Sequence, residues 1–338
     1  MALTLEELAR LARVSRSTVS RVVNDQPGVR DQVRQRVWEV VEETGYQPHA
    51  AARSLVTRRT GIVGVIIPEA VTTLFTDPFF GLLLYGITET CNAHHYHLML
   101  SLFNGPAEPG DMYRRVVSSG HVDGVIVASA HQDDPLFAKL LGDRVRFVLV
   151  GRHPDERVSY VDVDNAGGAR MAVEHLIRLG HTRIATITGP LSMSHGEDRL
   201  AGYRQALDAH HLPADDRLVV RGDYTEASGS VAAQRLLAAS PTAIFAASDM
   251  MAIGALKTLR EAGLRVPDDI ALVGFDDLPI AGSIEPALTT VRQPIERLGS
   301  ITMDLLLNLL ANSSGGQSPL RMVLPTQLVV RASCGALR

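Results

Sequence analysis

The sequence has little cysteine, few aromatic residues and no long apolar run. Its two cysteines, Cys91 and Cys334, lie far apart and have no partner at zinc-ligand spacing. This excludes a disulfide framework and a zinc finger, and it is typical of a reducing compartment. No apolar run approaches the ~18 residues of a membrane-spanning helix, and the first residues lack the basic and apolar regions of a signal peptide. We therefore expect a cytoplasmic protein with no membrane partner, no metal and no cofactor.

What the sequence does have is a large apolar fraction and an uneven distribution of charge. Hydrophobic residues make up 46% of the 338 residues, which predicts a folded core, and the length favours a small domain joined to a two-lobed one. The net charge is −4, yet residues 1–60 carry ten arginines against seven acidic residues. A basic N-terminal segment on an acidic body is the asymmetry expected of a DNA-binding arm on a sensor.

The start of the chain has the pattern of a helix-turn-helix. Thr4 and Glu7 form a capping-box pair that begins a helix, and the apolar spacing extends this helix to about Val14. Ser15 begins a second short helix with valines on one face and hydrogen-bond donors on the other: Arg16, Ser17, Ser20 and Arg21. Two short helices joined by a tight turn place the start of the second helix against base edges in the major groove.

A third helix is predicted from Asp31 to Thr44, because valines repeat at helical spacing there and Gly45 follows. Three helices with a solvated arginine face also occur in bundles that do not bind DNA. Helix spacing by itself does not separate these two interpretations.

Four segments resemble the lactose-repressor (LacI/GalR) family of transcription regulators, in the family's own order. They read LARVSRSTVSRVVND, GYQPHAAARSL, TGIVGVIIP and VGFDDLPIAGSIEPALTTVRQP, and the similarity covers essentially the whole chain. The resemblance implies a sequence-specific DNA-binding regulator, a homodimeric repressor on a palindromic operator. It also implies allosteric control by a small-molecule effector, a carbohydrate, bound between two lobes.

The resemblance assigns DNA contacts in the N-terminal segment. Arg16, Ser17 and Arg21 would read bases, and because arginine can bond guanine O6 and N7 together, we expect a guanine in each half-site. Phosphate contacts, which position without specifying sequence, are implied for a second group: Thr4, Ser15, Ser20, Asn24 and Arg34. Arg30 and Val33 stand where relatives usually have a serine cap and a threonine. We expect the charge of Arg30 to replace the lost phosphate contact.

Residues 48–60 are expected to form a hinge helix and a linker. His49–Leu55 has high helix propensity, but seven residues are too few for a lone helix in water. In the family two such helices, one from each subunit, fold together in the minor groove. There Leu55 would wedge into a base step, and the small Ala52 would allow close approach.

From Gly61 onward, apolar runs of strand length alternate with longer amphipathic stretches. Continuous apolar runs are typical of parallel strands that are covered on both faces. The first series is Ile62–Ile67, His97–Leu102, Val125–Ala128 and Phe147–Val150, with Tyr160–Val163 expected to bridge two lobes. The second series is Ile184–Ile187, Leu218–Val220, Ala243–Ala246 and Ala271–Val273.

The predicted fold is therefore an all-α helix-turn-helix headpiece, residues 1–47, followed by an α/β core, residues 61–338. The core would hold two doubly wound parallel-sheet lobes and resemble a type I periplasmic binding protein. The resemblance places about 61–161 and 293–320 in lobe one, and about 162–290 and 321–331 in lobe two. Ligands in such folds bind at the carboxyl ends of the strands, here between the lobes.

Residues just after these strands form a chemically coherent ligand site. Carboxylates accept from sugar hydroxyls, arginine and glutamine donate, and aromatic rings stack on the C–H face of a sugar. The resemblance places the effector contacts at Asp77, Phe79, Phe80, Arg152, His195, Arg199, Tyr224, Asp249, Asp276 and Gln293. Two adjacent phenylalanines are more often core, and Asp276 could be a helix cap. Gly151 stands where sugar binders often carry an acid, which leaves the identity of the ligand open.

Two other classes of protein share such a core. The sequence lacks the motifs of phosphate-binding loops (GxxxxGKS/T), dinucleotide-binding folds (GxGxxG), serine-hydrolase nucleophile elbows (GxSxG) and zinc proteases (HExxH). We therefore expect that the protein is not an enzyme. His94, His95 and His97 fall at a helix-to-strand junction where their side chains point different ways, which does not favour a metal site. A transported solute-binding protein would have a signal peptide and no headpiece. Whether the ligand releases DNA or promotes its binding stays open.

Overall fold

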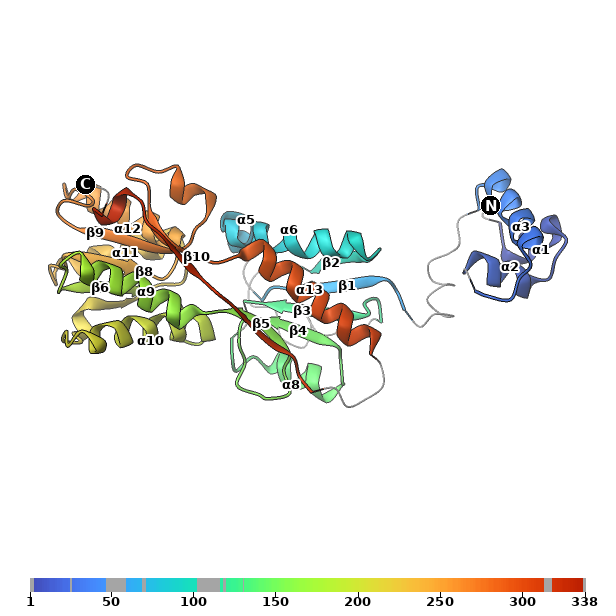
Figure 1. The fold of residues 1–338 in the computed structure, drawn as a ribbon, viewed down its shortest axis with the longest axis horizontal. Coiled ribbons are helices and arrows are strands. Elements are labelled where there is room, and N and C mark those ends of the chain that lie inside the picture. The colour runs from blue at the N-terminus through green and yellow to red at the C-terminus, as the bar shows by residue number, and fades with distance from the viewer. Residues whose placement is uncertain are drawn as a thin grey trace. The chain divides into compact units, whose positions relative to one another are not determined.

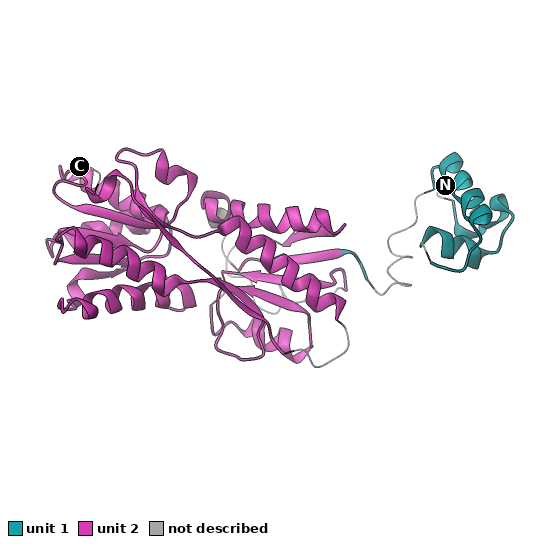
Figure 2. Ribbon diagram, viewed as in Figure 1, with its two compact units in different colours: residues 1–61 teal, residues 62–338 magenta. Residues whose placement is uncertain are grey.

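The computed structural model describes residues 3–24, 26–46, 59–68, 71–101, 116–117, 120–129, 131–312 and 318–336. The chain divides into two compact units, residues 1–61 and residues 62–338 (Figure 2). The predicted hinge contacts of Ala52 and Leu55 lie outside the described residues.

The first unit contains α1 (Leu5–Ala12), α2 (Arg16–Val23) and α3 (Asp31–Thr44). Thr4 and Glu7 form the predicted capping box, and the Ser15 side chain accepts a hydrogen bond from the Thr18 amide at the start of α2. Gly45 ends α3 with a φ of +61°, a conformation that glycine adopts without steric cost. Apolar residues of all three helices share one core, including the fully buried Leu8, Ala12, Val19, Val22 and Val37. The predicted helices are confirmed.

Lobe one of the second unit is built on a six-stranded parallel sheet with the order β11-β5-β4-β3-β1-β2 (Figure 1). Its strands are β1 (Ile62–Ile66), β2 (His97–Ser101), β3 (Gly124–Ala128), β4 (Phe147–Val150), β5 (Tyr160–Val163) and β11 (Arg321–Leu324). Every residue of β3, β4 and β5 is buried, as expected for strands covered on both faces.

Two strand predictions need correction. Tyr160–Val163 does not bridge the lobes, because it pairs with β4 and is a full member of the lobe-one sheet. The segment that begins at Arg321 was predicted to lie in lobe two, but it pairs in parallel with β5, with Arg321 opposite Tyr160. The first three residues of β11 are exposed, so this strand lacks the buried apolar pattern that marks the others. The chain re-enters lobe two only after Leu324.

Lobe two is built on a second six-stranded sheet with the order β12-β10-β9-β8-β6-β7. Its strands are β6 (Ile184–Thr188), β7 (Val219–Arg221), β8 (Ala243–Ala246), β9 (Ala271–Asp276), β10 (Thr289–Arg292) and β12 (Gln327–Val329). All pairs are parallel except β10 with β12, which is antiparallel. This antiparallel edge results from the chain returning along the sheet after β11.

Helices cover both sheets. Lobe one has α5 (Val71–Thr76), α6 (Pro78–Ala93), α8 (Pro135–Gly142) and α13 (Ile295–Ala311); lobe two has α9 (Asn165–Arg178), α10 (Ser194–Ala209), α11 (Glu226–Leu237) and α12 (Asp249–Glu261). Figure 1 shows α6 and α13 side by side, although they are far apart in the sequence. Among the described helices, none is long and apolar enough to cross a membrane.

Three connections join the lobes. The chain leaves lobe one after β5, returns between β10 and α13, and crosses again between β11 and β12. The carboxyl ends of the parallel strands of both lobes therefore face one cleft, which is where ligands bind in folds of this kind.

Candidate functional site

A cavity of about 730 Å³, including its open mouth, lies between the lobes. The structure brings eight of the ten predicted effector contacts to it: Asp77, Phe79, Phe80, His195, Arg199, Tyr224, Asp276 and Gln293. The lining also includes polar residues that the sequence patterns did not single out: Ser129, Asp162, Asn165, Asp223 and Ser248.

Arg199, on α10, is the centre of a buried hydrogen-bond network. Its Nε donates to Oδ1 of Asn165 at 2.9 Å. Its Nη1 donates to the backbone oxygen of Ala247 at 2.6 Å and lies 3.5 Å from Oδ1 of Asp276. The guanidinium also lies 3.7 Å from the centroid of the Phe275 ring, a cation–π contact. Arg199 is only 5% exposed, so this pairing compensates a charge that would otherwise be costly to bury.

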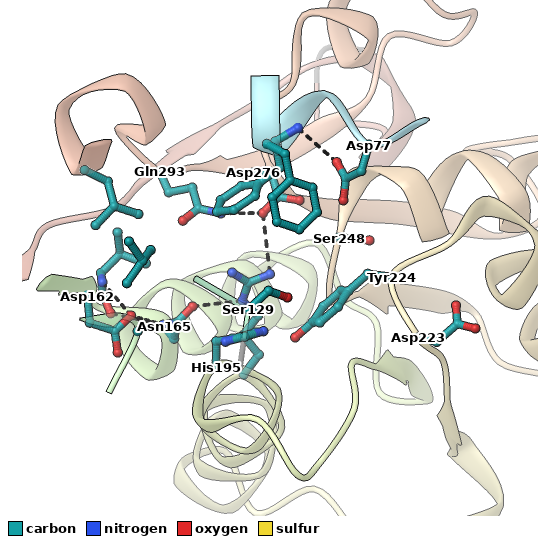
Figure 3. Close-up of a pocket in the computed structure, with 17 residues that line it drawn as sticks. Asp77, Ser129, Asp162, Asn165, His195, Asp223, Tyr224, Ser248, Asp276 and Gln293 are labelled. Carbon is teal, nitrogen blue, oxygen red and sulfur yellow. Dashed lines mark hydrogen bonds and ion pairs between the residues drawn. The ribbon is translucent and has the colours of Figure 1, made fainter. Parts of the chain in front are cut away.

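Asp276 ends β9 in a strained backbone conformation, with a φ of +119°. Its Oδ1 accepts a hydrogen bond from Nε2 of Gln293 at 2.6 Å (Figure 3). Burial raises the pKa of Asp276 to about 7, against the opposing effect of Arg199. The alternative of a helix cap does not hold, because the helical turn that follows begins at Pro279 with Leu278 at its N-cap.

Asp162 and Asn165 lie at the carboxyl end of β5 and point toward each other (Figure 3). Oδ1 of Asp162 accepts from Nδ2 of Asn165 at 2.9 Å and from the Val163 amide at 2.8 Å. Burial raises the pKa of Asp162 to about 6. The rule that ligands bind at strand carboxyl ends would have identified both residues, had β5 been predicted as a strand of lobe one.

The start of α6 brings Asp77 and two phenylalanines to the cavity. Oδ1 of Asp77 caps the helix by accepting from the Phe79 amide at 2.9 Å, and Pro78 occupies the first helical position. Burial raises the pKa of Asp77. The two rings meet edge to face at 5.4 Å. Phe80 is buried in the lobe-one core, whereas Phe79 is half-buried, so Phe79 is the ring available for stacking on a ligand.

Tyr224 and His195 form the aromatic wall of lobe two. Their ring centroids are 5.3 Å apart, and Figure 3 shows them next to each other. A Cβ on Gly189 would lie 2.1 Å from the Tyr224 ring, so glycine at position 189 makes room for that ring. Burial, together with the charges of Arg199 and His131, lowers the pKa of His195 to about 3. His195 is therefore neutral at physiological pH.

Asp249 was predicted to contact the effector, but it does not line the cavity. It is fully buried at the start of α12. Its two carboxyl oxygens accept from the Thr290 hydroxyl at 2.5 Å and from the Leu278 amide at 2.8 Å. Asp249 thus joins α12 to β10 and to the segment after β9, while its neighbour Ser248 reaches the cavity.

Arg152 was also predicted to contact the effector, and it too lies outside the cavity lining. Its guanidinium instead donates to Asp198 of lobe two. Nearby, Gln132 donates to Glu197 at 3.1 Å, and His131 hydrogen-bonds Ser192 at 2.7 Å. We call these three pairs the interlobe contacts. Because exposed polar pairs contribute little stability, they can break when the lobes move.

On the headpiece, the predicted base-reading residues Arg16, Ser17 and Arg21 are exposed on α2. Nη1 of Arg16 lies 3.1 Å from Oε1 of Glu6, and both side chains are about two-thirds exposed. Exposed ion pairs of this kind are weak, so the pairing with Glu6 costs little to break, and the contact of Arg16 with a base stays a prediction.

The predicted phosphate-contacting residues have structural roles of their own. Thr4 and Ser15 cap helices, and Nδ2 of Asn24 donates to the backbone oxygen of Ser20 at 2.7 Å. Arg34 donates to the backbone oxygen of Gln26 at 3.0 Å. Arg30 is the exposed N-cap residue of α3, and its side chain makes no capping hydrogen bond. The contacts of these residues with DNA stay predictions.

Known proteins match both units. The lacI family of bacterial regulatory proteins matches residues 4–49, and a periplasmic binding protein-like domain matches residues 173–334. The HTH-type transcriptional regulator CelR of Thermobifida fusca is 42% identical over 98% of both chains. A solved transcriptional regulator CelR–cellobiose complex has a TM-score of 0.78 at 40% identity, covering 98% of this chain and 99% of that one. The lac repressor dimer bound to operator and the anti-inducer ONPF has a TM-score of 0.84 at 27% identity over 99% of both chains.

A helix-turn-helix unit followed by a two-lobed α/β core is the architecture of a class of ligand-controlled, DNA-binding transcription regulators. The chain belongs to the LacI family of bacterial regulatory proteins. This confirms the family and the fold that the four sequence segments predicted. Its relatives are transcription regulators and not enzymes.

Proposed function

We propose that this protein is a homodimeric transcriptional repressor whose affinity for a palindromic operator is controlled by a sugar bound between the lobes. The observation that carries the proposal is the position of Arg199. Its guanidinium lines the cavity and bonds Asn165, which follows the first lobe connection. It also lies against Asp276, which bonds Gln293 at the second connection. A ligand that engages Arg199 therefore acts where the lobe arrangement is set.

The chemistry of the cavity supports a carbohydrate. Phe79 and Tyr224 offer aromatic faces, and carboxyl and amide oxygens around Arg199 accept from hydroxyl groups. A site that combines stacking faces with a few fixed polar groups suits a small polar ring. The CelR complex, at 40% identity, contains cellobiose. Cellobiose is therefore the first ligand to test here.

The headpiece supports operator binding by a dimer. A single helix-turn-helix buries too little surface for tight and specific binding, and a two-fold symmetric protein requires a two-fold symmetric site. The lac repressor, with the same fold over 99% of this chain, is a dimer in its operator complex. We expect an approximately palindromic site with a guanine in each half, read by Arg16 or Arg21.

The sugar is expected to act as an inducer. A ligand changes DNA affinity only by binding one lobe arrangement more tightly than the other. A sugar sensor that represses in the absence of its nutrient releases the operator when the nutrient arrives. Cellobiose should accordingly weaken operator binding.

The test combines operator selection, thermal unfolding and gel-shift titration of the full chain. Selection from randomised DNA should return a palindrome. Cellobiose at about 100 times its Kd should stabilise the core by roughly 2.7 kcal/mol and weaken operator binding at least ~10-fold. Arg199→Ala should lose both responses, whereas Arg204→Ala, an exposed arginine on the same helix, should keep them.

Three results would contradict the proposal. Tight binding of a monomer to a single half-site would exclude the dimeric operator. Stronger operator binding with cellobiose would make the sugar a corepressor. No stabilisation by any member of a panel of neutral mono- and oligosaccharides would exclude a carbohydrate effector.

A further inference from the structure

The cavity has an excess of negative groups. Four of its lining residues are aspartates: Asp77, Asp162, Asp223 and Asp276. Among the cavity-lining residues that the structure describes, Arg199 is the one cationic side chain, since His195 is neutral at physiological pH. An anionic ligand would therefore enter a site whose fixed charges repel it.

The charge of Arg199 is already matched by protein groups. Its Nε and Nη1 donate to Asn165 and to the backbone of Ala247, and Asp276 lies against Nη1. Outside the cavity lining, Arg152 is paired with Asp198 of the other lobe. Phosphate and carboxylate sites normally use arginine or lysine groups that are not committed to a protein carboxylate. Neither arginine here meets that condition.

Helix N-termini are the other common anion sites, but those near the cavity are capped by a side chain or have acidic residues close by. Asp77 caps α6, and the Ser248 hydroxyl caps α12 by accepting from the Met251 amide at 3.2 Å. Neither α10 nor α13 has a side-chain N-cap, but Glu197 and Asp198 lie in the first two turns of α10, and Glu296 lies in the first turn of α13. The positive end of each of these helices is therefore already compensated.

Two carboxyl groups are placed to accept hydrogen bonds from a ligand. Oδ1 of Asp77 accepts from the Phe79 amide, and Oδ1 of Asp162 accepts from Asn165 and Val163. Within the described part of the chain, no hydrogen bond reaches Oδ2 of either residue. Figure 3 shows the two carboxyl groups on opposite sides of Asp276, so they would contact different parts of one ligand.

We infer that the cleft selects uncharged sugars and rejects their phosphorylated and oxidised counterparts, with Asp162 and Asp77 as the selecting residues. The inference rests on the proposed carbohydrate function and narrows it. Sugar hydroxyls donate to the open carboxylate oxygens, whereas a phosphate or a sugar carboxylate can only accept. Like charges in a partly desolvated cleft add repulsion to this mismatch.

The test is isothermal titration calorimetry of the full chain at pH 7.5 with matched pairs of ligands. The pairs are cellobiose with cellobionate, and glucose with glucose 6-phosphate. In each pair that binds, we expect the neutral member to bind at least ~30-fold more tightly, about 2 kcal/mol. Equal or tighter binding of an anionic member overturns the inference but leaves the carbohydrate function standing. If no member of these two pairs binds, the neutral mono- and oligosaccharides of the panel and their anionic counterparts replace them, and no binding by any of these overturns the carbohydrate function itself.

The variant Asp162→Asn tests whether Asp162 is responsible for the preference for neutral over anionic sugars. Asparagine keeps an oxygen that accepts from the Val163 amide, so the β5 end is preserved while the charge is lost. The Kd of the anionic ligand divided by the Kd of its neutral counterpart should be at least ~5-fold smaller in this variant than in the wild type. The matched control is Asp208→Asn, the same charge change at an exposed position on α10, where the ratio should not move. An unchanged ratio in Asp162→Asn, with normal thermal unfolding, removes Asp162 from the selecting groups.

Discussion

Buried carboxyl groups dominate the chemistry of the cleft. Desolvation raises the pKa of Asp162 to about 6 and that of Asp276 to about 7, and in Asp276 this effect outweighs the neighbouring Arg199. Both groups lie at strand carboxyl ends that face the cavity. Such perturbed groups in a cleft are typical of ligand sites, because the protein holds them in place for a partner it must recognise.

The first prediction concerns the pH dependence of stability. Since the pKa of Asp162 is raised above its unfolded value of 3.8, the folded state binds more protons than the unfolded state between about pH 4 and pH 6. The free energy of unfolding therefore falls as the pH rises through this window. From pH 5 to pH 7.5 the wild type should lose about 1 to 2 kcal/mol more than Asp162→Asn.

Urea unfolding followed by far-ultraviolet circular dichroism measures this difference. Tryptophan fluorescence would not report on the core, because the single tryptophan, Trp38, lies on α3 of the headpiece. Parallel pH profiles for the wild type and Asp162→Asn would show that Asp162 titrates normally.

The second prediction distinguishes residues of the headpiece that contact bases from residues that contact phosphates. Arg16→Ala should relax base preference at one position of the half-site, at a cost of about 1 to 3 kcal/mol there. Arg34→Ala should weaken binding to all sequences about equally and reduce the salt slope by about one. Operator selection with each variant, followed by salt titrations, checks both. The same consensus from Arg16→Ala as from the wild type would remove Arg16 from the base contacts.

At the scale of elements, α6 and α13 make the closest helix contact among the described helices of lobe one. A Cβ on Gly86 would lie 1.9 Å from the backbone oxygen of Glu296, and one on Gly299 would lie 2.3 Å from that of Leu83. The two helices therefore approach backbone to backbone. Because α13 begins at the second lobe connection, this contact anchors that connection to lobe one.

The third prediction compares two glycines of α6. Gly86→Ala must push α13 away, since the obstacle is backbone, and should destabilise the core by about 1 to 3 kcal/mol. Gly81→Ala, in the same helix, meets no atom within 4 Å and should stabilise by about 0.5 to 1 kcal/mol through helix propensity. Thermal unfolding of both variants is the measurement. Equal shifts of the same sign would show that α6 and α13 are not held in this close contact.

Elements with a strong local pattern were predictable from the sequence, and those defined by long-range pairing were not. The helix Asp31–Thr44 has valines at helical spacing and a terminal glycine, so its limits follow from local residues. By contrast, β11 is exposed at its first three residues and gains its place only by pairing with β5, far away in the sequence.

The same distinction applies to the site. Asp276 and Gln293 were identified through family motifs and lie together in the cavity. Asp249, from an equally clear motif, points to Thr290 and Leu278 instead, because a residue's position at a helix start does not determine which way its side chain turns. Asp162 was missed because its strand was assigned to the connection between the lobes.

At the scale of the whole core, two sets of contacts lie between the lobes or at the connections that join them. The Arg199 network touches two of the three connections, and the interlobe contacts join the lobes through exposed polar pairs. The side chains of the Arg199 network are buried and held by several hydrogen bonds. The interlobe contacts are exposed, so water can replace their hydrogen bonds easily. We expect a ligand that binds the Arg199 network to shift the equilibrium between lobe arrangements. The interlobe contacts can then break or re-form as the lobes move.

The last prediction tests this coupling with Asp276→Asn. Asparagine resembles the protonated carboxyl group and keeps an acceptor for Gln293, so the fold should be retained. It removes the carboxylate that lies against Arg199 and lines the cavity. We expect the affinity for the sugar to fall at least ~30-fold, about 2 kcal/mol, and operator binding without sugar to stay within twofold. Because a ligand shifts an equilibrium only by its differential affinity for the two states, the variant should stay on its operator at sugar concentrations that release the wild type. Gel-shift titration with and without cellobiose, next to Asp208→Asn as the control, measures this. A variant that releases DNA at the wild-type sugar concentration would show that Asp276 does not couple the cleft to DNA binding.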